Sequence, residues 1–371
     1  MPVPGVVLEI LLGILIGPQV LGIAHEGPVL DFLQQLGFWM LFLMAGFEMD
    51  PAVLRGRALR NASLGWVVSG AIALGATMLL SRAGVISAPR LTAIALSTTA
   101  IGALLPILRD QGLMGPPYGP MVLAAGAAGE AGPVVALSLV LAGLQAPERG
   151  LVMFLFTVGA AVAVVAVARA RDRYFGAVLD RTMGTSGQFP MRLSIFLLVL
   201  LAALSHVLDI DLVIGAFVCG AMARAALPHQ LHDRFGARLD GLGSAFLVPI
   251  FFVTSGMELD VAAMTGNPVV LAMVPVYALL MLIARGVPAL LLYRSDLSAN
   301  KRIGLALHCG TQLTLVVAIT SIAVPAGLMP GDQGAALVGG GIVTMVLYPM
   351  LARGFLRPAV PPADPRRTEP A

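Results

Sequence analysis

A single carboxyl group lies near the middle of an apolar run that is long enough to cross a lipid bilayer. The run extends from Tyr118 to Gly143, and Glu130 is its only charged side chain. A carboxylate at this depth costs at least about 2.5 kcal/mol and is kept mainly where it faces a cavity, pairs with a cation or carries protons. Every other residue from Ala124 to Gly132 is Ala or Gly, so a neighbouring helix can approach closely. We therefore expect Glu130 to be the centre of a proton or ion site.

Two further apolar spans carry residues that interrupt a helix at one common depth. Residues 90–108 contain three adjacent hydroxyl residues, Ser97 to Thr99, followed by a glycine and a proline. Residues 302–326 contain Gly310, Thr311, Gln312 and Thr314. Such residues free backbone groups and offer polar side chains in their place. Two helices broken at the same level would present opposing dipole ends to a central cavity.

One acidic and one basic side chain can balance those helix ends. Glu130 and Arg285 are the candidates, because the other charges lie in connections or near the ends of spans. Each candidate also has a structural interpretation. Glu130 can be a protonated carboxyl bonded to a neighbour, Arg285 a structural ion, and the hydroxyls can bond back one turn. Charges or imidazoles expected to be interfacial or packed are Glu9, Glu48, Asp50, His206, Glu258, Asp260 and His308.

The composition predicts an all-α polytopic membrane protein. Of 371 residues, 58% are hydrophobic and 12% are charged, against about 25% charged in soluble domains. The mean hydropathy is +0.91. Two cysteines, Cys219 and Cys309, give neither a disulfide framework nor a metal-binding spacing. We find no soluble-enzyme motif, so we expect no enzymatic activity, no cofactor and no nucleic-acid partner.

Windows of about 20 apolar residues predict about twelve membrane spans. They centre on residues 3–23, 29–48, 62–81, 90–108, 119–144, 150–168, 192–208, 210–227, 241–258, 267–293, 302–326 and 334–352. With this count, nineteen of the 23 Lys and Arg residues fall on one side of the membrane. The asymmetry predicts a cytoplasmic C-terminus. Lys301 is the only lysine, a bias typical of GC-rich bacterial genomes, so we expect the bacterial inner membrane.

An internal repeat divides the chain. FWMLFLMAGFEMD, ending at Asp50, returns as FLVPIFFVTSGMELD, ending at Asp260, and the charge pattern places the two copies in opposite orientations. Two inverted halves place a substrate site near the bilayer midplane, between broken helices. The predicted parts are a first repeat at 1–144, a linker helix and cytoplasmic connection at 145–191, a second repeat at 192–352 and a disordered tail at 353–371. The alignment of the halves leaves the first repeat without its first helix, which favours a lost or misplaced start.

Four segments together resemble a known family. They are LLGILIGPQVLG, LGFWMLFLMAGFEMD, STTAIGALLPILRDQG and VPIFFVTSGMELD. They look like the monovalent cation:proton antiporter-2 family, the sodium/hydrogen exchanger-like membrane domain. The resemblance implies a thirteen-helix fold with two crossing discontinuous helices and a core domain that moves against a dimerisation domain. It also implies a homodimer and exchange of Na⁺ or K⁺ for protons.

The same resemblance assigns roles to individual residues. Glu130 matches the ion-binding aspartate, and Arg285 lies near the basic residue that compensates charge. The crossing, unwound helices contribute the remaining ion-site candidates, which are Thr98, Thr99, Thr311 and Gln312. Two positions depart from the family pattern. Gly129 stands where the family usually has Asn, Asp or Gln, and the acid is Glu, one methylene longer.

The predicted mechanism is alternating access, in which Glu130 carries a proton or a monovalent cation in turn. Arginine stays protonated in proteins, so Arg285 cannot exchange the proton itself. One titrating carboxyl predicts one proton for one cation. Two other interpretations remain at this stage: a sodium-coupled organic-anion symporter in which Arg285 binds the carboxylate, and a sensor or assembly component that has lost transport.

Overall fold

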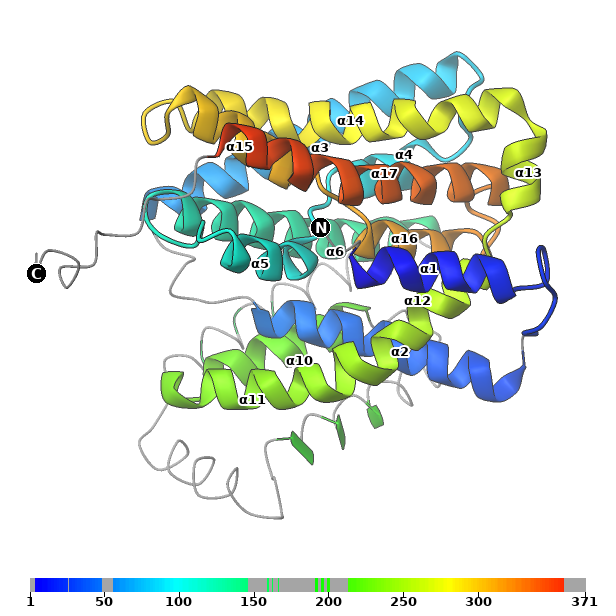
Figure 1. Ribbon diagram of the computed structural model, residues 1–371, viewed down its shortest axis with the longest axis horizontal. Helices are drawn as coiled ribbons and strands as arrows, with labels where there is room; N and C mark the ends of the chain where they lie inside the picture. Colours follow the sequence, from blue (N-terminus) through cyan, green and yellow to red (C-terminus); the bar gives the residue numbers. More distant parts are fainter. Residues whose placement is uncertain are drawn as a thin grey trace, which may run out of the picture.

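The computed structural model describes residues 4–25, 27–48, 56–145 and 213–356, with a few isolated positions between 159 and 200. Within these ranges the ordered elements are all helical (Figure 1). Much of the predicted spans 150–168 and 192–208, the connection between them, and the tail beyond residue 356 lie outside the described part of the chain. The division into repeats and linker therefore stays a prediction.

Most helix bounds follow the expected spans, but the first helix is shorter than the expected span 3–23, and the helical run that ends at Met257 begins at His229, well before the expected span 241–258. The helices are α1 (Gly5–Ile16), α2 (Pro28–Glu48), α3 (Gly56–Arg82), α4 (Pro89–Leu96), α5 (Ile101–Asp110), α6 (Tyr118–Gln145), α10 (Val213–Ala226), α11 (His229–Leu242), the π-helix η1 (Gly243–Leu247), α12 (Val248–Met257), α13 (Val261–Gly266), α14 (Pro268–Leu292), α15 (Ala299–Cys309), α16 (Thr314–Ala323) and α17 (Gly331–Phe355). α17 thus continues past the start of the predicted tail at residue 353.

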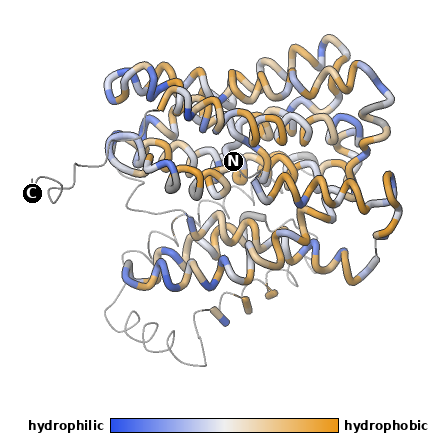
Figure 2. Tube along the Cα trace, in the orientation of Figure 1, coloured by the Kyte–Doolittle hydropathy of each residue, from blue (hydrophilic) through white to orange (hydrophobic). Residues whose placement is uncertain are grey.

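Seven of the described helical segments are long and apolar enough to cross a membrane. They include α2, α3, α6, α14 and α17, the continuous run of α11, η1 and α12, and the interrupted run of α15 and α16. Apolar residues occupy most of their length (Figure 2). The prediction of an all-α polytopic membrane protein is confirmed.

Two helix pairs cross closely at glycine residues, and one of them, α2 with α10, lies in the lower part of Figure 1. α1 packs on α12 and α2 packs on α10. A methyl group added at Gly13 would collide with the Val253 carbonyl, and one added at Gly46 would collide with the Phe217 carbonyl. Since only a residue without Cβ permits such an approach, these glycines set the helix separation.

The upper part of the molecule surrounds the two interrupted helices. α3 packs against α4, α6 and α14, and α14 packs against α15 and α17. Local sequence fixes where these helices start: α14 begins at Pro268, and the Asn267 side chain accepts the Val269 N–H at 3.0 Å. α4 and α16 lie inside this layer and contact each other, so the interruptions are shielded on several sides.

Both predicted helix breaks are confirmed. α4 ends at Leu96 and α5 begins at Ile101, while α15 ends at Cys309 and α16 begins at Thr314. The two connecting segments touch, because the Ala100 N–H donates to the Thr311 carbonyl at 3.0 Å. The chain therefore has a crossing of two discontinuous helices, and free helix ends meet there.

Candidate functional site

Glu130 lies at this crossing. Its side chain is 5% exposed, on the face of α6 that meets the first turn of α5. Carboxylate oxygen Oε1 accepts the Ile101 N–H at 3.1 Å and the Gly102 N–H at 3.4 Å. These are N–H groups of a helix N-terminus, which have no partner inside their own helix and favour negative charge. The second oxygen, Oε2, has no hydrogen-bond partner among the described residues. One oxygen is therefore anchored, and the other is available to a proton or an ion.

A second carboxyl group approaches the same helix end. Glu48 is the last residue of α2, and a methyl group added at Gly102 would lie 3.2 Å from its Oε2 atom. The sequence interpretation of Glu48 as an interfacial charge missed this neighbourhood. The available signal was the Gly-x-Glu-x-Asp repeat itself, which puts an acid at the end of a span; only the packing of α2 brings that acid to α5.

Arg285 joins three other helical segments without touching Glu130. The guanidinium is buried, with 4% of the residue exposed. It donates to the Thr99 hydroxyl at 3.0 Å, the Ala125 carbonyl at 2.8 Å and the Ser69 hydroxyl at 3.4 Å. No contact of hydrogen-bond or ion-pair length joins it to Glu130. Arg285 therefore supplies a fixed positive charge to the site and is held by neutral oxygens.

Thr99 connects the crossing to Arg285. Its hydroxyl accepts from Arg285 and donates to the Cys309 carbonyl at 2.8 Å, at the end of α15. Its backbone N–H donates to the Gly129 carbonyl at 2.9 Å. One residue thus links the α4–α5 break to α6, α14 and α15.

Thr98 and Gln312 fasten the two breaks to each other. The Thr98 hydroxyl lies 3.2 Å from the Gln312 Oε1 atom, and the Gln312 amide donates to the Leu96 carbonyl at 2.9 Å. The Thr311 hydroxyl instead donates to the Leu307 carbonyl, one turn earlier in α15. The structure brings all four predicted residues to the crossing, and the side chains of Thr98, Thr99 and Gln312 link its segments.

At Gly129 two neighbouring side chains occupy the space that a larger residue would need. A Cβ built on Gly129 would lie 2.6 Å from the Thr99 hydroxyl and 2.7 Å from the Thr99 Cβ, and would also collide with the Arg285 guanidinium. Thr99 and Arg285 therefore fill this position in the present chain, and glycine is required for them to do so.

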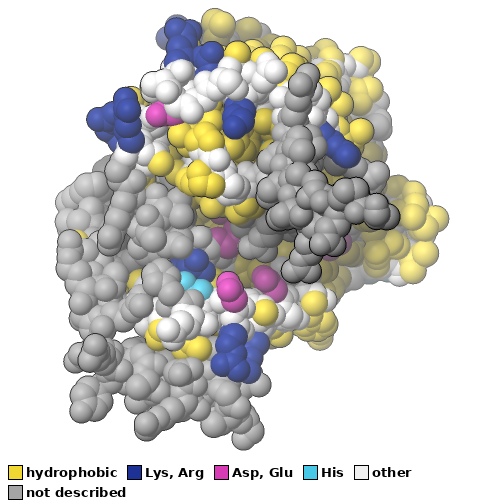
Figure 3. Space-filling view, turned by 60° about the vertical axis from the view of Figure 1, so that its left-hand side comes forward, with side chains coloured by type: hydrophobic (Ala, Val, Ile, Leu, Met, Phe, Trp, Pro, Cys, Tyr) yellow, Lys and Arg dark blue, Asp and Glu magenta, His cyan; other side chains and the backbone are white. Residues whose placement is uncertain are grey.

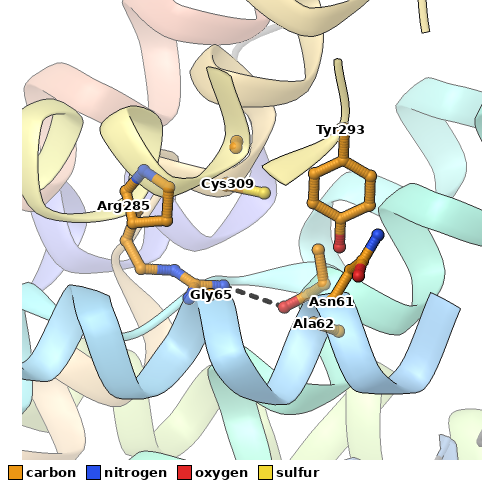
Figure 4. Close-up of a pocket in the computed structure, with 9 residues that line it drawn as sticks. Asn61, Ala62, Gly65, Arg285, Tyr293 and Cys309 are labelled. Carbon is orange, nitrogen blue, oxygen red and sulfur yellow. Dashed lines mark hydrogen bonds between the residues drawn. The ribbon is translucent and has the colours of Figure 1, made fainter. Parts of the chain in front are cut away.

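A small pocket lies beside Arg285, between α3, α6, α14 and α15. Its lining includes Asn61, Tyr293 and Cys309. The Tyr293 hydroxyl points toward Asn61 in this pocket (Figure 4) and has no hydrogen-bond partner in the described chain. The pocket gives the buried guanidinium a polar neighbourhood on the side of α3.

His308 is packed, as expected. It is 0% exposed, and its Nδ1 atom lies 2.7 Å from the Tyr118 hydroxyl. His206 lies outside the described residues. Among the residues that the structure describes, no three His, Cys, Asp or Glu side chains are grouped so that they could hold a metal ion.

Comparison with known proteins identifies the family. The family model for the sodium/hydrogen exchanger, transmembrane, matches residues 1–356. The chain belongs to this family. It is a family of transporters, so the protein is a transporter and not an enzyme. The exchanger assignment also agrees with the resemblance found in the four sequence segments.

Individual relatives share the exchanger domain at low identity. The Na⁺/H⁺–K⁺ antiporter GerN of Bacillus cereus is 26% identical over 379 residues, covering 95% of this chain and 90% of GerN. YjbQ of Bacillus subtilis is 27% identical over 368 residues, covering 94% of this chain and 58% of YjbQ. The chain thus spans little more than half of YjbQ.

A solved structure supports the fold. The sodium proton antiporter MjNhaP1 of Methanocaldococcus jannaschii superposes with a TM-score of 0.61 at 16% identity, over 94% of this chain and 89% of MjNhaP1. The antiporter fold predicted from the inverted repeat and the paired breaks is therefore confirmed.

Proposed function

We propose that the protein exchanges a monovalent cation, Na⁺ or K⁺, for protons across the membrane, with Glu130 as the shared site. The observation that carries this proposal is the arrangement of the Glu130 carboxylate. One oxygen is fixed by the N–H groups of Ile101 and Gly102, and the other has no described partner. Only a proton or a small ion can neutralise such a group in turn, and relatives with the same domain are named as cation/proton antiporters.

The charges at the crossing support a one-for-one exchange. Glu130 is the buried carboxyl at the crossing, whereas Glu48 beside it is exposed. One proton or one monovalent cation neutralises the single buried carboxylate. A neutral loaded site moves through an apolar layer at a lower cost than a charged empty site. Exchange is therefore coupled in both directions, and we expect it to be electroneutral.

The polar residues at the two breaks complete the proposed site. Thr98, Thr99, Thr311 and Gln312 keep the connecting segments open and hydrogen-bonded. We propose that backbone carbonyls and hydroxyls of these breaks act with Glu130 as the oxygen ligands that a partly dehydrated Na⁺ or K⁺ requires. Arg285 compensates charge without entering the ion shell.

We further propose alternating access by movement of the core domain, in a homodimer with a cytoplasmic C-terminus. Lys and Arg side chains lie on the end of the molecule that holds the C-terminal end of α17, which agrees with the charge asymmetry of the sequence (Figure 3). An organic-anion symporter is less well supported, because the Arg285 guanidinium already binds Thr99, Ser69 and Ala125.

The proposal is tested by dye-reported ΔpH in everted vesicles to which Na⁺, K⁺ or Li⁺ is added. Wild type should dissipate the gradient, and Glu130→Gln should not. Glu258→Gln is the matched control, since this acid ends α12 and its Oε1 accepts from Gln34 away from the crossing. Equal dissipation of ΔpH by wild type and Glu130→Gln would contradict the assignment of Glu130 as the shared site. A voltage-sensitive dye in the same vesicles reports whether the exchange moves net charge.

A further inference from the structure

α6 contains a proline three residues after Glu130. Pro133 lies inside the helix, and it has no N–H to donate to the carbonyl four residues earlier, which belongs to Gly129. A buried carbonyl left without its helical partner needs another donor. The Gly129 carbonyl has one, because it accepts the Thr99 N–H at 2.9 Å.

The same position is shaped for Thr99 in a second way. Gly129 has no Cβ, and a methyl group there would overlap the Thr99 side chain and the Arg285 guanidinium. The Gly129 carbonyl therefore binds the Thr99 N–H, and the absence of a side chain on Gly129 leaves room for the Thr99 side chain.

The contact at Gly129 is connected to the Glu130 carboxylate through consecutive backbone amides of the α4–α5 break. Gly129 holds the N–H of Thr99, and Glu130, the next residue of α6, holds the N–H groups of Ile101 and Gly102. The Ala100 N–H between them goes to the Thr311 carbonyl. Every backbone N–H from Thr99 to Gly102 is thus directed by α6 or by the other break, which fixes the first turn of α5 against Glu130.

We propose that Pro133 and Gly129 are positioning residues that dock the α4–α5 break onto α6. Pro133 frees the Gly129 carbonyl for Thr99, and the bare Gly129 gives Thr99 and Arg285 their room. The docking itself follows from the contacts; its effect on cation binding rests on the proposed exchange at Glu130.

Pro133→Ala restores an N–H that draws the Gly129 carbonyl back into the helix. Pro275→Ala is the matched control: Pro275 also lies inside a membrane helix, is exposed, and frees the Leu271 carbonyl, which accepts no bond from another element in the described chain. Hydrogen–deuterium exchange of the purified protein, read by mass spectrometry with electron-transfer fragmentation of peptides covering residues 97–102, resolves the Thr99 amide.

In Pro133→Ala we expect exchange at Thr99 to be about tenfold faster, and in Pro275→Ala unchanged. Gly129→Ala, which keeps the proline but adds the colliding methyl, should also expose the Thr99 amide. Unchanged exchange in Pro133→Ala, or an equal change in both proline variants, overturns the proposal. Rapid exchange of the Thr99 amide in the wild type also overturns it, even where a variant does not fold.

Transport gives the second readout. For Pro133→Ala we expect the KM for Na⁺ to rise about fivefold while kcat stays within about twofold, because the ion site loosens before the moving step is affected. A purely structural defect would lower the amount of active protein and leave KM unchanged. If Glu130→Gln retains cation/proton exchange, the proposed function fails. The hydrogen–deuterium exchange of the Thr99 amide still decides whether Pro133 and Gly129 dock the break onto α6.

Discussion

The Glu130 carboxylate accepts the backbone N–H of Ile101 at 3.1 Å, and this contact joins the middle of α6 to the first residue of α5. A charged acceptor at a helix N-terminus gains from the unpaired N–H groups and from the helix dipole. The helix end can therefore hold an ionised carboxylate in an apolar layer without a neighbouring cation side chain. That leaves room for a transported cation.

Shortening the acid tests this contact. Glu130→Asp moves the carboxylate back by about 1.5 Å, which is too far for a hydrogen bond to Ile101. The variant still titrates, so we expect exchange to persist with a KM for Na⁺ about tenfold higher. Cation titration in proteoliposomes measures it, beside Glu130→Gln, which should be inactive. Wild-type KM in Glu130→Asp would show that the α5 helix end does not support the ion site.

Glu48 provides a second test, because it changes the charge of the site without touching Glu130. Glu48→Gln removes one negative charge beside the α5 helix end that holds Glu130. Cation affinity should fall about tenfold, while Glu48→Asp should keep most of it. The measurement is the Na⁺ concentration that gives half-maximal ΔpH dissipation. If Glu48→Gln and the control Glu258→Gln behave alike, Glu48 is not part of the site.

The features of the site that depend on local composition were predictable from the sequence. Hydroxyl residues, glycine and amide side chains at one depth predicted both breaks, since these residues weaken helices wherever they occur. The lone acid among small residues predicted a close crossing at Glu130. The roles of Ser69 and Glu48 were not predictable in this way, because each depends on which helices lie side by side. The partners of Arg285 follow from the same long-range packing.

The close crossing of α2 and α10 gives a prediction about stability. Replacing glycine by alanine inside a helix usually stabilises it by up to about 1 kcal/mol. At Gly46 the added methyl collides with the Phe217 carbonyl, so Gly46→Ala should instead destabilise the fold by about 1–3 kcal/mol. Gly75→Ala in α3 is the control, because nothing lies within 4 Å of its Cβ position. Thermal unfolding of the purified variants compares them, and equal melting temperatures would contradict the crossing.

Trp66 offers a direct report of ion binding. The chain has two tryptophans, and the Trp66 ring lies against Gly132, two residues after Glu130. Its indole Nε1 atom is buried without a partner among the described residues, so its emission should respond to a change of charge nearby. In Trp39→Phe, which leaves Trp66 as the single tryptophan, Na⁺ should shift the fluorescence, and adding Glu130→Gln should abolish the shift. Because Trp39 lies in α2, apart from this contact, Trp66→Phe should show little response. If Trp39 instead carries the fluorescence response to Na⁺, the change linked to ion binding lies away from α6. That result would contradict the assignment of Glu130.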